Sequence, residues 1–194
     1  MEFGLHDWYC QEPDGATRTG SPAPRALIAG SFNPLHAGHR QLAAIAEHRL
    51  GLPVAYELSR VNVDKPPLAD EEVRRRLAQF VGVSPIYVTR APTFERKASL
   101  FPGAVMIVGC DTAERILDPR YYQSLADRQR SLTILGDQGT KFLVAGRVNR
   151  DGRFVGLEHV HIDAEFRHLF EAIPESDYRV DLSSSQIRQG QAGQ

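Results

Sequence analysis

The chain has 194 residues, a normal size for one domain, and its 42% hydrophobic content is enough to fill a single core. Its 23 Lys and Arg residues nearly balance 24 Asp and Glu residues. This balance excludes a global basic field, so we expect no nucleic-acid partner. Cys10 and Cys110 indicate neither a disulfide framework nor a metal cluster. Because no apolar run reaches the roughly 18 to 20 residues of a membrane span, we expect a cytoplasmic protein with no membrane partner.

The first 24 residues differ in composition from the rest of the chain. Residues 11–24 are rich in Gly, Pro, Ser, Thr and charged residues, which bury too little apolar surface to offset the entropy of ordering. We therefore predict a flexible N-terminal arm over residues 1–24 and a single domain over residues 25–194.

Strands and helices alternate along that domain. An apolar run at residues 26–29, closed by Gly30, is typical of a buried strand, and a helix with apolar residues at helical spacing follows over residues 42–50. Further strands are predicted near residues 54–58, 86–89, 104–108, 132–135, 142–145 and 179–182, helices near residues 70–81 and 119–130 and from Ser184, and a hairpin within residues 148–160. This order predicts an α/β fold, with a mainly parallel sheet and helices on both faces.

The run GSFNPLHAGH, from Gly30 to His39, lies between the first predicted strand and the first predicted helix. Ligands of open α/β sheets bind at this place. Gly30 permits a sharp turn that brings the amides of Ser31 and Phe32 toward a phosphate, and the start of the helix adds a partial positive charge. The loop is therefore a candidate anion site.

Two histidines in this run are spaced to act together. His36 and His39 are three residues apart, so in a first helical turn their side chains lie on one face. Gly38 between them leaves space for a ligand, which would explain a glycine where it costs about 1 kcal/mol relative to alanine. The alternative is a pair of solvated histidines at a helix start.

A second group follows near the C-terminus. Ser183, Ser184 and Ser185 precede Arg188, so hydroxyls and amides at a helix start would meet phosphate oxygens together with a bidentate guanidinium. An ordinary helix cap is the alternative interpretation for three serines taken alone.

The decapeptide resembles the signature of the HxGH nucleotidyltransferase superfamily, with His36-Ala37-Gly38-His39 as its HxGH, and residues 181–188 resemble the second signature. The sequence is most similar to nicotinamide and nicotinate mononucleotide adenylyltransferases. The resemblance covers about residues 25–190 and implies a Rossmann-like fold.

Weaker matches to the same family lie between the two motifs. Lys65 would contact a phosphate, with a plain surface lysine as the alternative, and Thr93 with Phe94 resembles the loop that holds the acceptor base, with an apolar loop plug as the alternative. Gly109 and Asp111 would contact a ribose or the acceptor, although Asp111 could equally cap the next helix.

Arg147 is a further candidate cation for a phosphate. The resemblance implies that an acceptor phosphate attacks the α-phosphorus of ATP directly and expels pyrophosphate. His36 and His39 would donate hydrogen bonds to phosphate oxygens, and Arg188 with the serine amides would hold the leaving pyrophosphate. Mg²⁺ would be bound mainly through the ATP phosphates, without a protein metal site.

We therefore expect ATP and a small phosphorylated acceptor as partners, with a pyridine mononucleotide first among acceptors. The alternatives are adenylyl or cytidylyl transfer to phosphopantetheine or glycerol phosphate, and a nucleotide-binding regulatory module without turnover. A relative of class I aminoacyl-tRNA synthetases is disfavoured, because the chain lacks their Lys-rich second signature. A homo-oligomer stays open.

Overall fold

An eight-stranded sheet forms the centre of this computed structural model, which describes residues 7–63, 66–149 and 151–179. The strand order is β10-β7-β6-β3-β4-β5-β1-β2, and the six strands from β10 to β5 are parallel. The strands are β1 (Trp8–Gln11), β2 (Thr17–Arg18), β3 (Ala26–Ala29), β4 (Ala55–Ser59), β5 (Ile86–Thr89), β6 (Val105–Gly109), β7 (Lys141–Ala145) and β10 (Phe170–Ile173). The expected mainly parallel sheet is confirmed.

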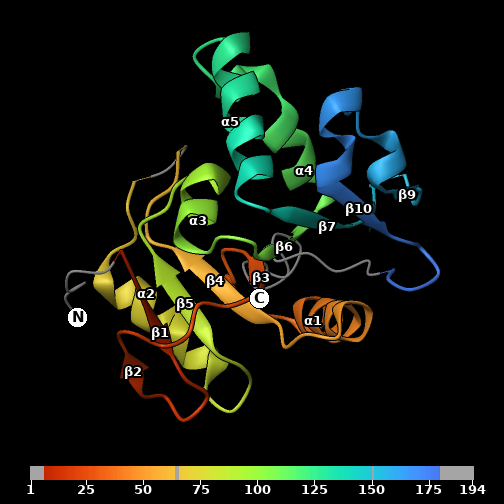
Figure 1. Cartoon of the computed structure of the whole chain (residues 1–194). Helices are drawn as coiled ribbons and strands as arrows, with labels where there is room; N and C mark the ends of the chain where they lie inside the picture. Colours follow the sequence, from red (N-terminus) through yellow and green to blue (C-terminus); the bar gives the residue numbers. More distant parts are fainter. Residues whose placement is uncertain (1–6, 64–65, 150, 180–194) are drawn as a thin grey trace.

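Helices cover both faces of the sheet, as predicted (Figure 1). One face packs against α1 (Ala37–Leu50) and α2 (Asp70–Leu77), which bury Leu42 and Leu77 in its apolar cluster. The other packs against α3 (Phe94–Leu100), α4 (Cys110–Leu117) and α5 (Leu125–Asp137), which bury Ala98, Leu117 and Leu132. The 3-10 helices are η1 (Ala78–Phe80), η2 (Pro119–Tyr121), η3 (Leu157–His159) and η4 (Ala164–Leu169).

The path of the chain through the sheet reverses next to β3. From β3 the chain runs outward through β4 and β5, then returns to the other side of β3 and continues through β6, β7 and β10. The carboxyl ends of β3 and β6 therefore lie on either side of a topological switch point, where open α/β sheets bind their ligands.

The N-terminal segment differs from the predicted flexible arm. Strand β1 pairs antiparallel with β5, from Trp8 opposite Thr89 to Gln11 opposite Ile86, and β2 pairs with β1. The Trp8 ring lies 5.4 Å from the Tyr87 ring, and Tyr9 and Cys10 are buried. Four residues with two aromatic rings bury enough apolar surface to anchor the segment, a signal that the polar composition of residues 11–24 obscured.

Other local differences follow from short apolar runs that fit two structures. The strand predicted at residues 132–135 belongs to α5, because Leu132 and Leu135 are buried one helical turn apart on the same helix. The helices α3 and α4 and the strand β10 were not predicted. The hairpin is confirmed as β8 (Arg147–Val148) paired with β9 (Phe154–Val155). Of the strand near residues 179–182 only the first residue is described, and the helix from Ser184 lies outside the described residues.

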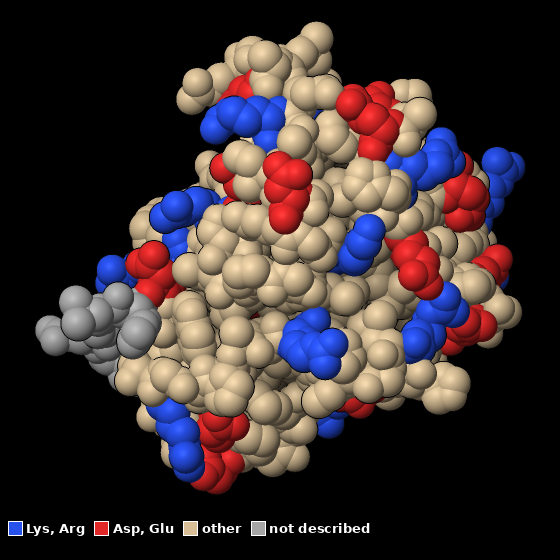
Figure 2. Space-filling view, viewed as in Figure 1, with Lys and Arg blue, Asp and Glu red and all other residues tan. Residues whose placement is uncertain are grey.

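The described surface carries mixed charges. On the face seen in Figure 2, basic and acidic side chains are intermingled rather than separated into areas of one sign. None of the helices in the described part of the chain combines the length and the apolar composition needed to cross a membrane.

Candidate functional site

The loop between β3 and α1, residues 30–36, begins at the switch point. Its start is tied to the neighbouring strand, because the Gly30 amide donates to the Glu57 carbonyl oxygen at 3.0 Å. A Cβ atom on Gly30 would lie 2.8 Å from the Phe32 ring. Glycine is therefore required here by packing within the loop, whatever part a phosphate also plays.

Phe32 is held in a strained conformation inside the loop. Its φ is 46°, in the left-handed region that non-glycine residues rarely adopt. Its side chain is completely buried, with ring centroids of His39, Tyr56 and Phe80 at 5.2, 5.3 and 5.2 Å. Of the predicted nucleotide contacts of Phe32, only those of its backbone can reach a ligand in this arrangement.

The two histidines of the HxGH run stack on each other at the start of α1. Their ring centroids are 3.8 Å apart at an interplanar angle of 29°. The His36 backbone amide donates to Nδ1 of His39 at 3.3 Å, so the proton of a neutral His39 ring is on Nε2. Nδ1 of His36 is buried and has no hydrogen-bond partner among the described residues.

Burial keeps both imidazoles uncharged. It lowers the pKa of His36 below its ordinary value, and it lowers the pKa of His39 from 6.5 to about 4, with a smaller contribution from the nearby His36. At neutral pH both rings are therefore neutral groups, each with one N–H to donate.

A cleft of about 840 Å³ opens at the carboxyl ends of β3, β4 and β5. Four predicted site residues line it: Gly30, Ser31, Thr93 and Phe94. Thr93 caps α3, since its hydroxyl accepts from the Arg96 amide at 3.3 Å, and Phe94 also packs against Phe142. Phe94 therefore acts as an apolar plug and also forms part of the cleft wall.

A buried ion pair that the sequence interpretation missed also lines this cleft. Lys97 Nζ lies 2.7 Å from both carboxylate oxygens of Glu57, and the Thr89 hydroxyl donates to the same carboxylate at 2.5 Å. Glu57 is 1% exposed and Lys97 is 5% exposed. The available signal was a glutamate within an otherwise apolar strand, since a buried carboxylate requires a partner.

The far wall of the cleft carries aromatic and basic side chains from η2 and its neighbours. The Arg115 guanidinium lies 4.8 Å from the centroid of the Tyr121 ring, which is 46% exposed, and the Tyr122 hydroxyl donates to the Ile116 carbonyl oxygen at 2.6 Å. The sequence offered no signal here beyond an Arg-Tyr-Tyr run.

The structure brings Asp111 and Arg147 together. The Arg147 Nε lies 2.8 Å from a carboxylate oxygen of Asp111, because β6 and β7 are paired with Gly109 opposite Ala145. Both side chains are more than half exposed, and neither lines the cleft. The N-cap of α4 is Gly109, so the alternative of Asp111 as the cap is wrong, and Asp111 lies in the first turn instead.

The second motif lies outside the described residues, as does Lys65. This holds for Ser183, Ser184, Ser185 and Arg188. Shortly before that motif, the Tyr178 hydroxyl donates to the carbonyl oxygen of Gly38 at 3.2 Å. The described chain therefore reaches the first turn of α1 at Tyr178.

The sequence matches the family described as cytidylyltransferase-like over residues 27–190, which is most of the chain. A comparison with curated proteins gives no match.

Proposed function

The chain belongs to the cytidylyltransferase-like family, and on that premise we propose that it transfers AMP from ATP to nicotinamide or nicotinate mononucleotide, releasing pyrophosphate. The observation that carries the proposal is the stacked, neutral pair His36 and His39, placed at a helix start directly after the loop at the switch point.

The proposed reaction is a single displacement. An oxygen of the acceptor phosphate attacks the α-phosphorus of ATP and forms the new bond to it, while the bond from that phosphorus to the bridging oxygen breaks. Pyrophosphate leaves with the electron pair, and no covalent enzyme intermediate forms. Charge on the phosphate oxygens must be stabilised by groups that are already in position. His36 and His39 offer ring N–H donors there, and Arg188 with Ser183, Ser184 and Ser185 would hold the pyrophosphate.

The cleft supports a mononucleotide acceptor. Its volume of about 840 Å³ is in the range of small-molecule sites. Its lining includes Ser31 of the loop and Tyr121, which is 46% exposed and whose aromatic ring is suited to stacking on a flat heterocycle. Thr93 and Phe94 also line the cleft.

Mg²⁺ is proposed to arrive with the triphosphate. Among the described residues, no group of three or more His, Cys, Asp or Glu side chains is arranged to hold a metal ion. In this proposal the ion is held by phosphate oxygens and water, the usual situation for Mg²⁺ on a nucleotide. Bound in this way, the ion would screen the negative charge of the triphosphate.

The test is pyrophosphate release from the Mg²⁺ complexes of ATP and CTP, over a panel of four acceptors: nicotinamide mononucleotide, nicotinate mononucleotide, phosphopantetheine and glycerol phosphate. We expect release with ATP and one pyridine mononucleotide, and its loss in His39→Ala. CTP is included because the matched family is named for cytidylyl transfer. Turnover only with CTP, or only with a non-pyridine acceptor, would overturn the proposed substrates. Nucleotide binding without turnover would favour the regulatory module.

A further inference from the structure

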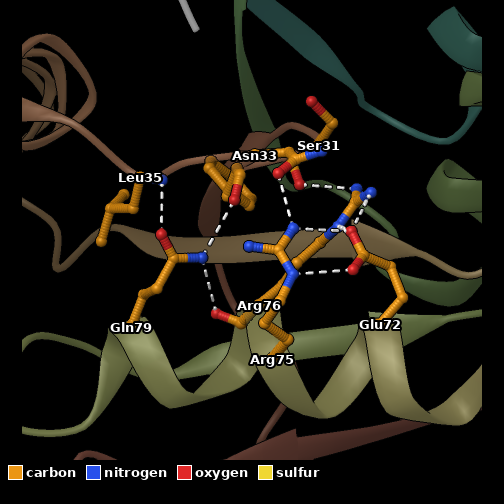
Figure 3. A network of polar contacts seen from close by, with 8 residues as sticks. Ser31, Asn33, Leu35, Glu72, Arg75, Arg76 and Gln79 are labelled. Atoms are coloured by element: carbon orange, nitrogen blue, oxygen red, sulfur yellow. Dashed lines mark hydrogen bonds and ion pairs between the residues drawn. The ribbon is translucent and has the colours of Figure 1, made fainter. Parts of the chain in front are cut away.

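Helix α2 and its 3-10 extension η1 hold the backbone of the β3–α1 loop through side chains (Figure 3). Nη1 of Arg76 donates to the Ser31 carbonyl oxygen at 2.9 Å. Nε2 of Gln79 donates to the Phe32 carbonyl oxygen at 3.0 Å, while Oε1 of Gln79 accepts from the Leu35 amide at 2.8 Å. Three polar groups of an irregular backbone segment are therefore satisfied by two side chains of one helical segment.

These contacts orient the peptide group between Ser31 and Phe32. In a planar trans peptide the carbonyl and the following N–H point in opposite directions. Because the Ser31 carbonyl is turned onto Arg76, the Phe32 amide points away from α2. A carbonyl oxygen free to turn the other way would present negative charge to an incoming anion. The contact with Arg76 prevents that reversal.

The same contacts stabilise the strained residue of the loop. A non-glycine residue with φ in the left-handed region is strained and persists only when its surroundings fix it. Phe32, with φ 46°, has its carbonyl held by Gln79 and its ring packed on Phe80, both from η1. Without them, the loop would relax toward a more ordinary backbone conformation.

The arginines of α2 also bring positive charge to the loop. The Glu72 carboxylate is shared by Arg75 and Arg76, with contacts of 2.7 Å to each, and these two arginines, Arg75 first, lower its pKa to about 2. One carboxylate between two guanidiniums leaves a net charge of +1. Arg75 also donates to the Asn33 side chain at 2.6 Å, and Arg76 lines the cleft beside Ser31.

We propose that Arg76 and Gln79 are positioning residues for the phosphates of the nucleotide: they hold the β3–α1 loop in the conformation that binds a pyrophosphate group. The inference rests on the nucleoside triphosphate part of the proposed function and is independent of the acceptor. Neither residue needs to touch the ligand. The two side chains determine the conformation of the loop and not whether the helix forms.

The test measures binding of inorganic pyrophosphate with Mg²⁺ by calorimetry, because pyrophosphate is the shared product of ATP and CTP donors. The variants are Gln79→Met, which keeps the side-chain length but removes both hydrogen bonds to the loop, Arg76→Met, and the conservative Arg76→Lys. Arg74→Met is the matched control, because Arg74 lies on the exposed face of the same helix. Thermal unfolding of each variant reports whether the fold is retained.

We expect Gln79→Met and Arg76→Met each to weaken pyrophosphate binding roughly ten- to a hundredfold. Arg76→Lys should recover part of the loss, and Arg74→Met should bind as the wild type does. In turnover, kcat should fall with pyrophosphate affinity while the KM for the acceptor stays constant. A merely structural role would lower the melting temperature without lowering kcat selectively while the KM for the acceptor stays constant.

Unchanged pyrophosphate affinity in folded Gln79→Met and Arg76→Met would overturn the inference, even if the wild type is an active adenylyltransferase. Wild-type protein that binds pyrophosphate but uses none of the tested acceptors would overturn only the proposed acceptor. If the wild type binds neither pyrophosphate nor ATP nor CTP, both the inference and the nucleotidyl transfer reaction are wrong.

Discussion

The two polar pairs at the carboxyl edge of the sheet are stabilised in opposite ways. His36 and His39, at the start of α1, are uncharged because burial disfavours their protonated forms. Glu57 and Lys97, beneath the cleft, are buried more deeply and compensate each other within an ion pair. A neutral imidazole can donate its N–H to an arriving phosphate, whereas the lysine and the carboxylate of the ion pair are already bonded to each other. The histidine pair is therefore suited to catalysis, and the ion pair is suited to maintaining the shape of the cleft.

The largest effect should come from breaking the ion pair. In Lys97→Met the carboxylate of Glu57 would remain buried without its cation, so we expect the free energy of unfolding to fall by roughly 3–5 kcal/mol. The double variant Glu57→Gln with Lys97→Met should recover most of that loss, because no charge is left to compensate. Urea denaturation at neutral pH measures both. A single variant as stable as the wild type would mean that the pair does not carry the compensation assigned to it.

The histidine side of the comparison is tested by His39→Asn. The asparagine oxygen can still accept from the His36 amide in place of Nδ1, but the donor at Nε2 is lost. We expect kcat to fall about 10²- to 10³-fold, the usual cost of removing one donor to a developing oxyanion. The measurement is pyrophosphate release with the best substrate pair of the wild type. His48→Asn, at an exposed position of the same helix, is the control and should be unaffected.

The pH dependence of stability sharpens the same contrast. Because the pKa of His39 falls from 6.5 in its ordinary state to about 4 in the fold, the unfolded chain binds the extra proton first. Stability should therefore decrease as pH falls from about 6.5 to about 4, by on the order of 3 kcal/mol. The free energy of unfolding, measured by denaturation at several pH values across that range, should depend less on pH in His39→Asn. Equal slopes in both proteins would contradict a buried neutral His39.

The smallest effect is expected at the far wall. Tyr121→Leu keeps an apolar side chain but removes the ring, so the KM for a pyridine acceptor should rise two- to tenfold while the KM for ATP is unchanged. Tyr121→Phe keeps the ring and should match the wild type. If both variants raise the KM alike, the hydroxyl rather than the ring face contacts the acceptor.

The sequence was sufficient for the parts of the fold that depend on local pattern. The strand that ends at Gly30, the loop and the following helix are adjacent in sequence, so their spacing predicted where His36 and His39 lie. The parallel sheet followed from the alternation of strands and helices. These features need no knowledge of distant contacts.

What could not be predicted depends on partners far apart in the chain. Gln79 contacts Leu35 across 44 positions, and Lys97 contacts Glu57 across 40. For an arginine or glutamine on a polar helix, the local sequence does not distinguish a side chain that holds a distant loop from one that is solvated. The ion pair of Asp111 with Arg147 likewise exists only because β6 and β7 are neighbours. Both residues are candidates from the sequence, but their contact with each other could not be predicted from it.

The N-terminal strands have a consequence for how the chain can be shortened. Without β1, the edge of the four-residue strand β5 would present unpaired amides and carbonyls, which invite pairing with another molecule. In the intact chain the outermost strand is β2, only two residues long, exposed and bearing Arg18, which is a poor template for such pairing. A truncation at residue 25, which composition alone would suggest, would remove this protection and make the protein prone to aggregation.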